Sequence, residues 1–181
     1  LNRYRWDMTH LGPWRDDQAR RFSDGPLAVP GTYTARVSVG GMTSSASFDL
    51  MVDPRVSEQG VNVSDINEQT ELQGHISALL SNSRKLEEEA KAEHGSLHRQ
   101  YRGQSNEERG AEANADFDRV HTVVRTLGTP NVIYPKAGLV GMISYLYNIN
   151  SDADQKPGKD SIDRFAELTA EYNAVEAAFR D

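Results

Sequence analysis

The sequence predicts an α+β fold in which a short antiparallel β region precedes an antiparallel helical bundle. Three segments within residues 1–56 alternate apolar and polar side chains with a period of two, as half-buried strands do. Pro54 closes that region, and residues 57–181 place apolar side chains three or four positions apart, which is typical of amphipathic helices. We therefore divide the chain into a β module, residues 1–56, and a bundle of three to four helices, residues 57–181.

Three segments of the β module read as strands. Alternation runs through Gly31–Val39 and again through Thr43–Val52, and Gly40-Gly41 between them is typical of a two-residue hairpin turn. Residues 4–8 alternate in the same way. Residues 9–30 show no periodicity, and a loop of that length is expected to lie against something, held by its large apolar side chains.

The helical region carries its own start and stop signals. Asp65 with Glu68 predicts a capped helix start, and His94-Gly95 predicts the end of that helix. Gly74 and the pair Gly138-x-x-Gly141 indicate close packing between helices, because glycine inside a helix otherwise costs stability.

Three further helices are expected beyond residue 100. Ser105 with Glu108 forms a second capping box ahead of an apolar stripe that ends at Leu127, before Gly128-Thr129-Pro130. Residues 136–148 and 162–179 continue the helical pattern. Four helices with one apolar stripe each are best buried as an antiparallel bundle.

Composition excludes several functional classes. Residues 1–56 carry 7 Lys/Arg and 6 Asp/Glu (+1), whereas residues 57–181 carry 13 and 21 (−8), so a nucleic-acid partner is not expected. Without cysteine there is no thiol nucleophile and no disulfide. The most apolar stretch, Val132–Ile149, is interrupted by Pro135 and Lys136 and is too short to span a bilayer.

Histidines and carboxylates are the residues from which a metal or catalytic site could be built. His94 and His98 have the spacing of a metal-binding pair near Glu93, but Gly95 is expected to end the helix between them, so neither a metal nor a cofactor is predicted. The acidic runs are interpreted as solvated surface; they are Glu87-Glu88-Glu89, Glu107-Glu108 and the loop residues Asp152, Asp154 and Asp160. No catalytic residue is predicted.

The apolar surface of the β module is the feature of the sequence that best indicates a function. Its strands present at least seven apolar side chains, and leaving them in water would forgo on the order of 10 kcal/mol at 1.5–3 kcal/mol each. A protein partner covering the open face or edge of the sheet is therefore expected. The predicted partner-binding residues are Tyr4, Trp6, Trp14, Phe22, Tyr33, Val37, Phe48 and Leu50.

Several segments resemble one protein family. They are Asn2–Asp7 (NRYRWD), residues 25–37 (GPLAVPGTYTARV), Phe48–Arg55 (FDLMVDPR) and the closing helical stretch Leu139–Phe179. Their order is similar to the C-terminal region of bacterial exported, sortilin-like proteins with a VPS10/BNR-repeat β-propeller, often labelled glycosyl-hydrolase-like. The resemblance implies a partial Ig-like β-sandwich whose earlier strands, and a propeller, would precede residue 1.

From these observations we expect a non-catalytic structural or protein-interaction module. It would be the tail of a larger exported protein, or an accessory subunit of an envelope assembly, located in the periplasm or outside the cell. It would have no transmembrane segment of its own, although it could be attached to a membrane complex.

Two alternatives remain open. The chain could complete a glycoside-hydrolase-type site through His10, Trp14 and Asp16 on the long loop. It could instead be a carbohydrate-binding accessory module, for which Trp6 and Trp14 are the only tryptophans available.

Overall fold

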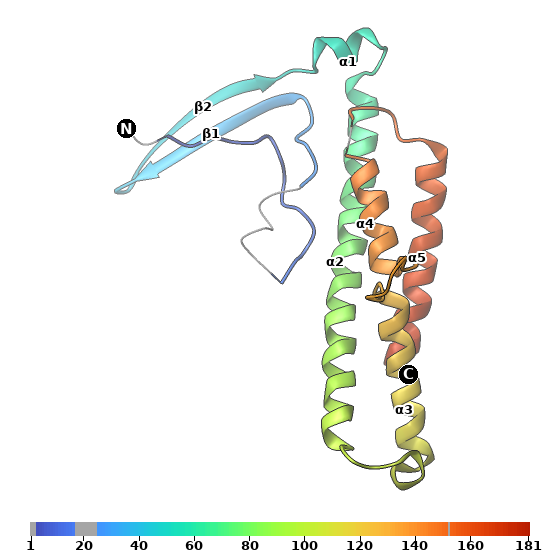
Figure 1. Cartoon of the computed structure of the whole chain (residues 1–181). Coiled ribbons are helices and arrows are strands. Elements are labelled where there is room, and N and C mark those ends of the chain that lie inside the picture. Colours follow the sequence, from blue (N-terminus) through green and yellow to red (C-terminus); the bar gives the residue numbers. More distant parts are fainter. Residues whose placement is uncertain (1–2, 17–24, 152) are drawn as a thin grey trace.

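The computed structural model describes residues 3–16, 25–151 and 153–181 and confirms an α+β chain. In this described part, a two-stranded antiparallel sheet precedes five helices. Figure 1 shows the hairpin projecting sideways from one end of a long helix, with three other helices lying alongside that helix.

The hairpin follows from local sequence. Strands β1 (Gly31–Val39) and β2 (Met42–Leu50) are joined by Gly40 and Gly41, whose φ angles are 56° and 81°. Two positive φ angles in a two-residue turn match the right-handed twist of the strands, and glycine adopts them without steric cost. The register pairs Val39 with Met42, so the alternation predicted from the sequence places one apolar and one polar face on the ribbon.

The polar face of the hairpin satisfies its own hydrogen bonds. The Thr32 Oγ1 hydroxyl donates to Asp49 Oδ1 at 2.7 Å, and the hydroxyls of Ser38 and Thr43 are 2.9 Å apart. Cross-strand pairs of this kind hold the two strands in register. The apolar face is covered only in part, and it becomes the candidate site described below.

The predicted third strand, residues 4–8, is wrong. This segment forms no ladder with β1 or β2, and in the described part of the chain an isolated bridge joins Thr9 to Leu27. Met8 has a φ of 62°, and the Asp7 carboxylate accepts hydrogen bonds from the Thr9 N–H and Oγ1. This turn bends the chain away from the strand direction, and Trp6 instead lies over the apolar face of the hairpin.

The described part of the long loop lies against helix α2 (Val63–Gln100) at Trp14, in agreement with the expectation from its length. The Trp14 N–H donates to Ser81 Oγ at 2.9 Å, and Arg84 Nη1 donates to the Trp14 carbonyl oxygen at 3.0 Å. The two arms of the loop are also joined, because the Ala28 N–H donates to the Met8 carbonyl at 2.7 Å. These bonds fix the base of the hairpin to the helices.

Helix α2 begins earlier and ends later than its sequence signals predict. Its capping box is formed by Asn62 and Asp65, not by Asp65 and Glu68, because the Asn62 side chain accepts from the Asp65 N–H while Asp65 accepts from the Asn62 N–H. The predicted end at Gly95 is also wrong. The helix runs on to Gln100, because Gly95 keeps a helical conformation and packing against the next helix continues past it, where His98 contacts Phe117. A short helix that the pattern did not predict, α1 (Pro54–Glu58), precedes it.

The other helices agree with the pattern more closely. They are α3 (Asn106–Leu127), which is interrupted by Gly110 at a φ of 81°, α4 (Leu139–Ile149) and α5 (Lys159–Arg180). The Ser105–Glu108 capping box is confirmed. These three helices and α2 all contact one another and enclose one apolar core. Its fully buried members include Ile76, Leu80, Val120, Leu127, Leu139, Ile143 and Leu168.

Polar contacts at the helix ends complete this packing. Arg180 donates to both carboxylate oxygens of Glu89 at 2.6 and 2.9 Å, which joins the end of α5 to α2. The buried Gln69 amide donates to the carbonyl oxygens of Asn150 and Ala153, both at 2.6 Å, and holds the loop after α4 against α2. In the described part of the chain, no helix is both long enough and apolar enough to cross a membrane.

Two glycine predictions need correction. Gly74 is exposed, and a Cβ added there would meet no atom within 4 Å, so it does not mark close packing. Gly138 and Gly141 do lie at a close approach, but it is to the last residue of α3, Leu127, and to the loop that follows it, and not between the sides of two helices. A Cβ on Gly138 would lie 2.3 Å from the Gly128 carbonyl oxygen.

Replacing Gly74 with alanine is expected to raise the free energy of unfolding by about 0.5–1 kcal/mol, since alanine loses less backbone entropy in a helix and nothing obstructs its methyl group. Urea unfolding followed by circular dichroism measures this change. Gly110→Ala is the matched control with the opposite sign, because a φ of 81° strains any side chain. A loss of stability in the Gly74 variant would contradict the open surroundings described for that position.

Candidate functional site

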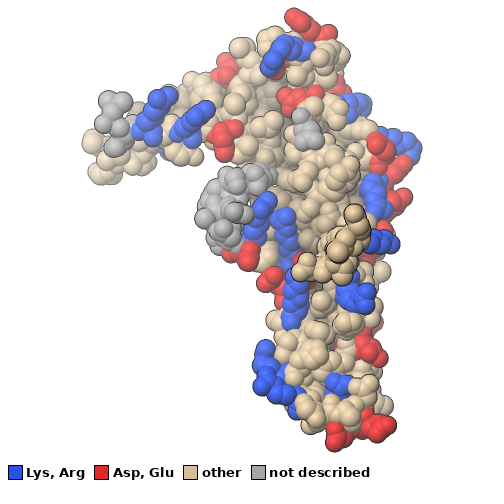
Figure 2. Space-filling view, viewed as in Figure 1, with Lys and Arg blue, Asp and Glu red and all other residues tan. Residues whose placement is uncertain are grey.

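The apolar face of the hairpin exposes several large hydrophobic side chains. Val37, Val39 and Met42 are 63%, 68% and 76% exposed, and Phe48 on the same face is 42% exposed. Large contiguous apolar surfaces of this kind are unusual in isolated soluble domains and commonly mark contacts with other molecules. Figure 2 shows the projecting arm as mainly uncharged, with Lys or Arg side chains at a few places.

An aromatic cluster covers the base of this face. The Trp6 ring centroid lies 5.3 Å from that of Tyr33 and 6.0 Å from that of Phe48, and the Tyr33 and Phe48 rings are 6.0 Å apart in a stacked pair. The Tyr33 hydroxyl donates to the Val29 carbonyl at 2.6 Å, which anchors the cluster to the loop. Because the cluster reaches only Tyr33 and Phe48, the half of the face near the turn stays uncovered in the described structure.

The helices do not cover the hairpin. No residue of β1 or β2 has its Cα within 8 Å of the Cα of a helical residue, whereas the two strands contact each other along their whole length. In the described residues each strand pairs only with the other, so one edge of each presents unpaired backbone groups. Such edges are ready to accept a further strand.

The end of β2 opens onto a hollow next to the helices. Leu50 is half-buried there, and a hollow of about 460 Å³ lies between the end of the hairpin and the start of α2. Its walls include Met8, Leu27, Leu50, Met51 and Ile66. The apolar surface therefore continues from the hairpin to the top of the helices.

The predicted partner-binding residues fall into separate places. Trp6, Tyr33, Val37, Phe48 and Leu50 share the apolar side of the hairpin. Tyr4 is 88% exposed beside it. Trp14 is half-buried on α2, away from the strands, and Phe22 lies outside the described residues.

Val39 and Met42 were missed as site residues. They are the last cross-strand pair before the turn and continue the apolar face beyond Val37. The signal was present in the sequence, because both extend the alternation of their strands up to Gly40-Gly41.

The loop residues considered for an enzymatic role show no built site. His10 is exposed, and its backbone N–H donates to the Pro26 carbonyl at 2.8 Å. Asp16 is exposed, and the Trp14 main chain is bound to α2. Four hollows on the described part of the chain are lined by other residues.

The acidic runs act as surface charge and helix caps. Glu87 pairs with Lys91 at 2.7 Å, and Glu89 pairs with Arg180. Glu108 accepts from the Ser105 N–H, and this bond lowers the pKa of its carboxyl. Asp152 lies outside the described residues. Within the described part, no three His, Asp or Glu side chains are arranged to hold a metal ion.

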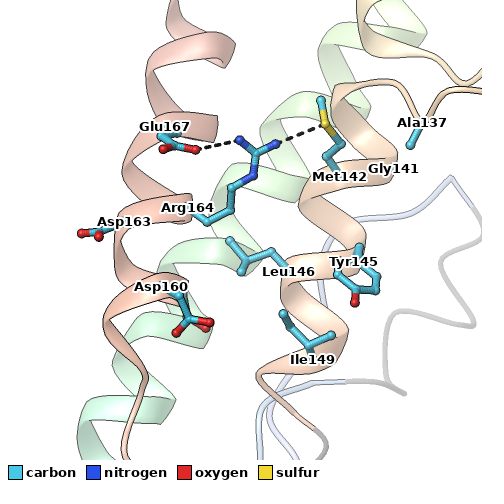
Figure 3. A pocket seen from close by; sticks show the side chains of 11 residues that line it. Ala137, Gly141, Met142, Tyr145, Leu146, Ile149, Asp160, Asp163, Arg164 and Glu167 are labelled. Carbon is cyan, nitrogen blue, oxygen red and sulfur yellow. Dashed lines mark hydrogen bonds and ion pairs between the residues drawn. The ribbon is translucent and has the colours of Figure 1, made fainter.

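A second hollow, of about 820 Å³, lies between α4 and α5 (Figure 3). Arg164 crosses it, with Nη1 2.8 Å from Glu167 Oε2 and Nη2 3.3 Å from Met142 Sδ. Tyr145, Leu146 and Ile149 of α4 form the opposite wall. The guanidinium is therefore engaged by Glu167 and Met142 within the hollow.

Three of the five histidines gather where α2 and α3 meet. The ring centroids of His94 and His98 are 4.5 Å apart, and those of His94 and His121 are 5.5 Å apart. The pKa of His94 is lowered by burial and then by the neighbouring His98 and His121, which disfavour its positive charge. Sequence reasoning missed this group because Gly95 was expected to end the helix.

The geometry therefore presents an apolar, partly aromatic ribbon with free edges, set apart from a helical core. No family model, no curated protein and no solved structure matches this chain. The resemblance to exported sortilin-like proteins accordingly stays a prediction.

Proposed function

We propose that this chain is a non-catalytic protein-interaction module in which strands of another segment or subunit complete the sheet of the hairpin. The supporting observation is the apolar face around Val37, Val39 and Met42, which no helix covers. A two-stranded hairpin with one apolar face is marginally stable alone, so pairing or packing by a partner would stabilise it.

The energetic reason is the area that such a partner would remove from water. Full burial of one large apolar side chain contributes roughly 1.5–3 kcal/mol, so covering Val37, Val39 and Met42 contributes several kcal/mol before the cost of association. The free backbone groups at the outer edges of β1 and β2 add hydrogen bonds that fix the register of an incoming strand.

In this proposal, residues 1–56 form one part of an Ig-like antiparallel sandwich and residues 57–181 form an antiparallel helical bundle. The chain would be the tail of a larger exported protein or an accessory subunit of an envelope assembly, in the periplasm or outside the cell. This location rests on the resemblance carried by the β motifs. The bonds from Ser81 and Arg84 to the Trp14 main chain would transmit the position of the hairpin to the helices.

The test measures whether the chain alone exposes a binding surface. Purified alone, it is expected to bind a hydrophobic dye such as anilinonaphthalene sulfonate, or to self-associate in sedimentation velocity. The triple variant Val37→Thr, Val39→Thr and Met42→Gln is expected to lower both dye binding and self-association. It makes the exposed face polar, and threonine keeps a high preference for β-strands.

The control substitutes the polar face of the same hairpin, with Thr32→Ser, Thr34→Ser and Ser38→Thr. It should leave dye binding and self-association as in the parent chain. A dye-negative, stable monomer of the parent would sink the proposal, as would equal loss of signal in the two triple variants.

A further inference from the structure

The loop between α3 and α4, residues 128–138, carries three consecutive exposed apolar side chains. Val132, Ile133 and Tyr134 are 61%, 86% and 96% exposed. Three exposed apolar residues in a row are avoided on soluble surfaces unless they have a function. Figure 1 shows the loop standing out from the bundle where α3 ends, and Figure 2 shows it as a mainly uncharged lobe on the near face. It belongs to the helical part of the chain and is separate from the hairpin.

The base of this loop is held closed. The Gly138 N–H donates to Thr129 Oγ1 at 3.0 Å, and the Val132 N–H donates to the Pro130 carbonyl oxygen at 3.0 Å. Tyr134 has a φ of 58°, which is uncommon for a residue other than glycine, and such outliers cluster at binding sites. The backbone therefore presents the apolar tip to the outside and holds it away from the core.

Two unpaired cations lie beside the loop. Arg125 in the last turn of α3 and Lys136 within the loop line a hollow of about 570 Å³ at the base of the loop. Both side chains are exposed, and no described carboxylate forms an ion pair with either of them. Their positive charges are therefore available to an anionic partner.

The carboxylates that face the same hollow already have partners. Glu87 is paired with Lys91 at 2.7 Å, and Glu171 Oε1 lies 3.7 Å from Arg164 Nη1. The hollow is lined by three cations and two carboxylates, which gives +1. Although the whole chain carries −7, the charge next to the apolar tip is thus positive.

We propose that this loop contacts the surface of a membrane that contains anionic lipids. Ile133 and Tyr134 would enter the interfacial region, and Arg125 and Lys136 would meet the lipid phosphates. Apolar side chains combined with neighbouring Lys and Arg residues are the features by which proteins bind such surfaces reversibly. Tyrosine suits the interface, because its ring is apolar and its hydroxyl is polar.

The small size of the tip favours a lipid surface over a protein partner. Three side chains offer less area than the roughly 800 Å² that each partner contributes to a standard protein interface. A membrane surface needs only a few inserted side chains, with the charges beside them adding to the binding.

Flotation of the full chain with lipid vesicles on a density gradient measures this contact, because self-associated chains without lipid sink. We expect binding to vesicles of equimolar phosphatidylcholine and phosphatidylglycerol, and weaker binding to phosphatidylcholine alone. High salt should reduce the difference, because it screens the cations.

Two double variants test the two parts of the surface. Ile133→Ser with Tyr134→Ser should weaken binding to the anionic vesicles at least about tenfold, since burial of one large apolar side chain contributes that factor or more. Arg125→Gln with Lys136→Gln should remove the preference for anionic vesicles, because each cation near such a surface contributes about fivefold. All four side chains are exposed, so circular dichroism should show both variants folded.

The matched charge control is Arg99→Gln with Arg102→Gln, which removes two cations at the turn between α2 and α3, beyond the other end of α3. It should bind vesicles as the parent does. The hairpin variant Val37→Thr, Val39→Thr and Met42→Gln should also bind as the parent does, which separates this contact from the function proposed for the hairpin.

Absence of vesicle binding by the parent would overturn the proposal and leave a protein as the partner of the loop. Unchanged binding after substitution of Ile133 and Tyr134 would overturn it as well, and so would loss of binding in the hairpin variant. Equal binding to both kinds of vesicle, or an equal loss in the Arg99 and Arg102 control, would overturn the assignment of Arg125 and Lys136 to lipid phosphates.

Discussion

Leu80→Ala is expected to lower the free energy of unfolding by about 2–5 kcal/mol, the range seen when a buried leucine is truncated. Leu80 is 1% exposed in the middle of α2, where α2 meets the other core helices. The loss combines the transfer free energy of the missing methyl groups with the cost of the cavity they leave. Because a domain of this kind is stable by only about 5–15 kcal/mol, this one change would remove a large part of its stability.

Urea unfolding at equilibrium measures the effect as a lower midpoint with an unchanged slope. Ile133→Ala is the control, because Ile133 is 86% exposed in the loop before α4 and its truncation should stay within about 0.5 kcal/mol. A Leu80 variant as stable as this control would contradict the position of Leu80 in the core.

Gly138→Ala is expected to cost about 1–3 kcal/mol, since a methyl group there forces well-packed backbone apart. The added Cβ would lie 2.3 Å from the Gly128 carbonyl oxygen and 2.6 Å from that of Leu127. Both obstacles are main-chain atoms at the end of α3, which cannot rotate away. The hydrogen bond from the Gly138 N–H to Thr129 Oγ1, 3.0 Å long, would be strained as well.

A graded series of identical changes tests this assignment. Gly141→Ala should cost less, because its nearest obstacle is the Thr129 hydroxyl at 3.1 Å, and Gly74→Ala should be stabilising. The midpoint of thermal unfolding is expected to be lowest for Gly138→Ala, higher for Gly141→Ala and highest for Gly74→Ala. A Gly138 variant as stable as the Gly74 variant would show that the loop after α3 does not close on the start of α4.

Sequence reasoning succeeded where a signal is local. The Gly40-Gly41 turn and the Ser105–Glu108 capping box each depend on residues within a few positions of one another, so the sequence contains all that determines them. The stop after Leu127 belongs to the same class.

Predictions from the sequence failed where contacts between residues far apart in the chain determine the structure. Residues 4–8 alternate like a strand, but packing of Trp6 on Tyr33 and Phe48 places them over the face of the hairpin and not at its edge. Gly95 has a weak preference against helix, which the packing of α2 on α3 overrides. The group of His94, His98 and His121 was missed for the same reason, since His121 joins it only through the contact between α2 and α3.

The candidate surface was predictable in part. Alternation identified the apolar face, and cross-strand pairing then added Val39 and Met42. Trp14 could not be placed from the pattern, because its position depends on Ser81 and Arg84, about 70 residues further along the chain.

The two hydrogen bonds that join Trp14 to α2 do not depend on the Trp14 side chain. Both bonds use the amide hydrogen and carbonyl oxygen of the main chain, which nineteen of the twenty amino acids supply alike; proline alone lacks the hydrogen. Both hydrogen bonds would therefore survive substitution of Trp14 by any residue other than proline. The half-buried indole ring takes no part in them.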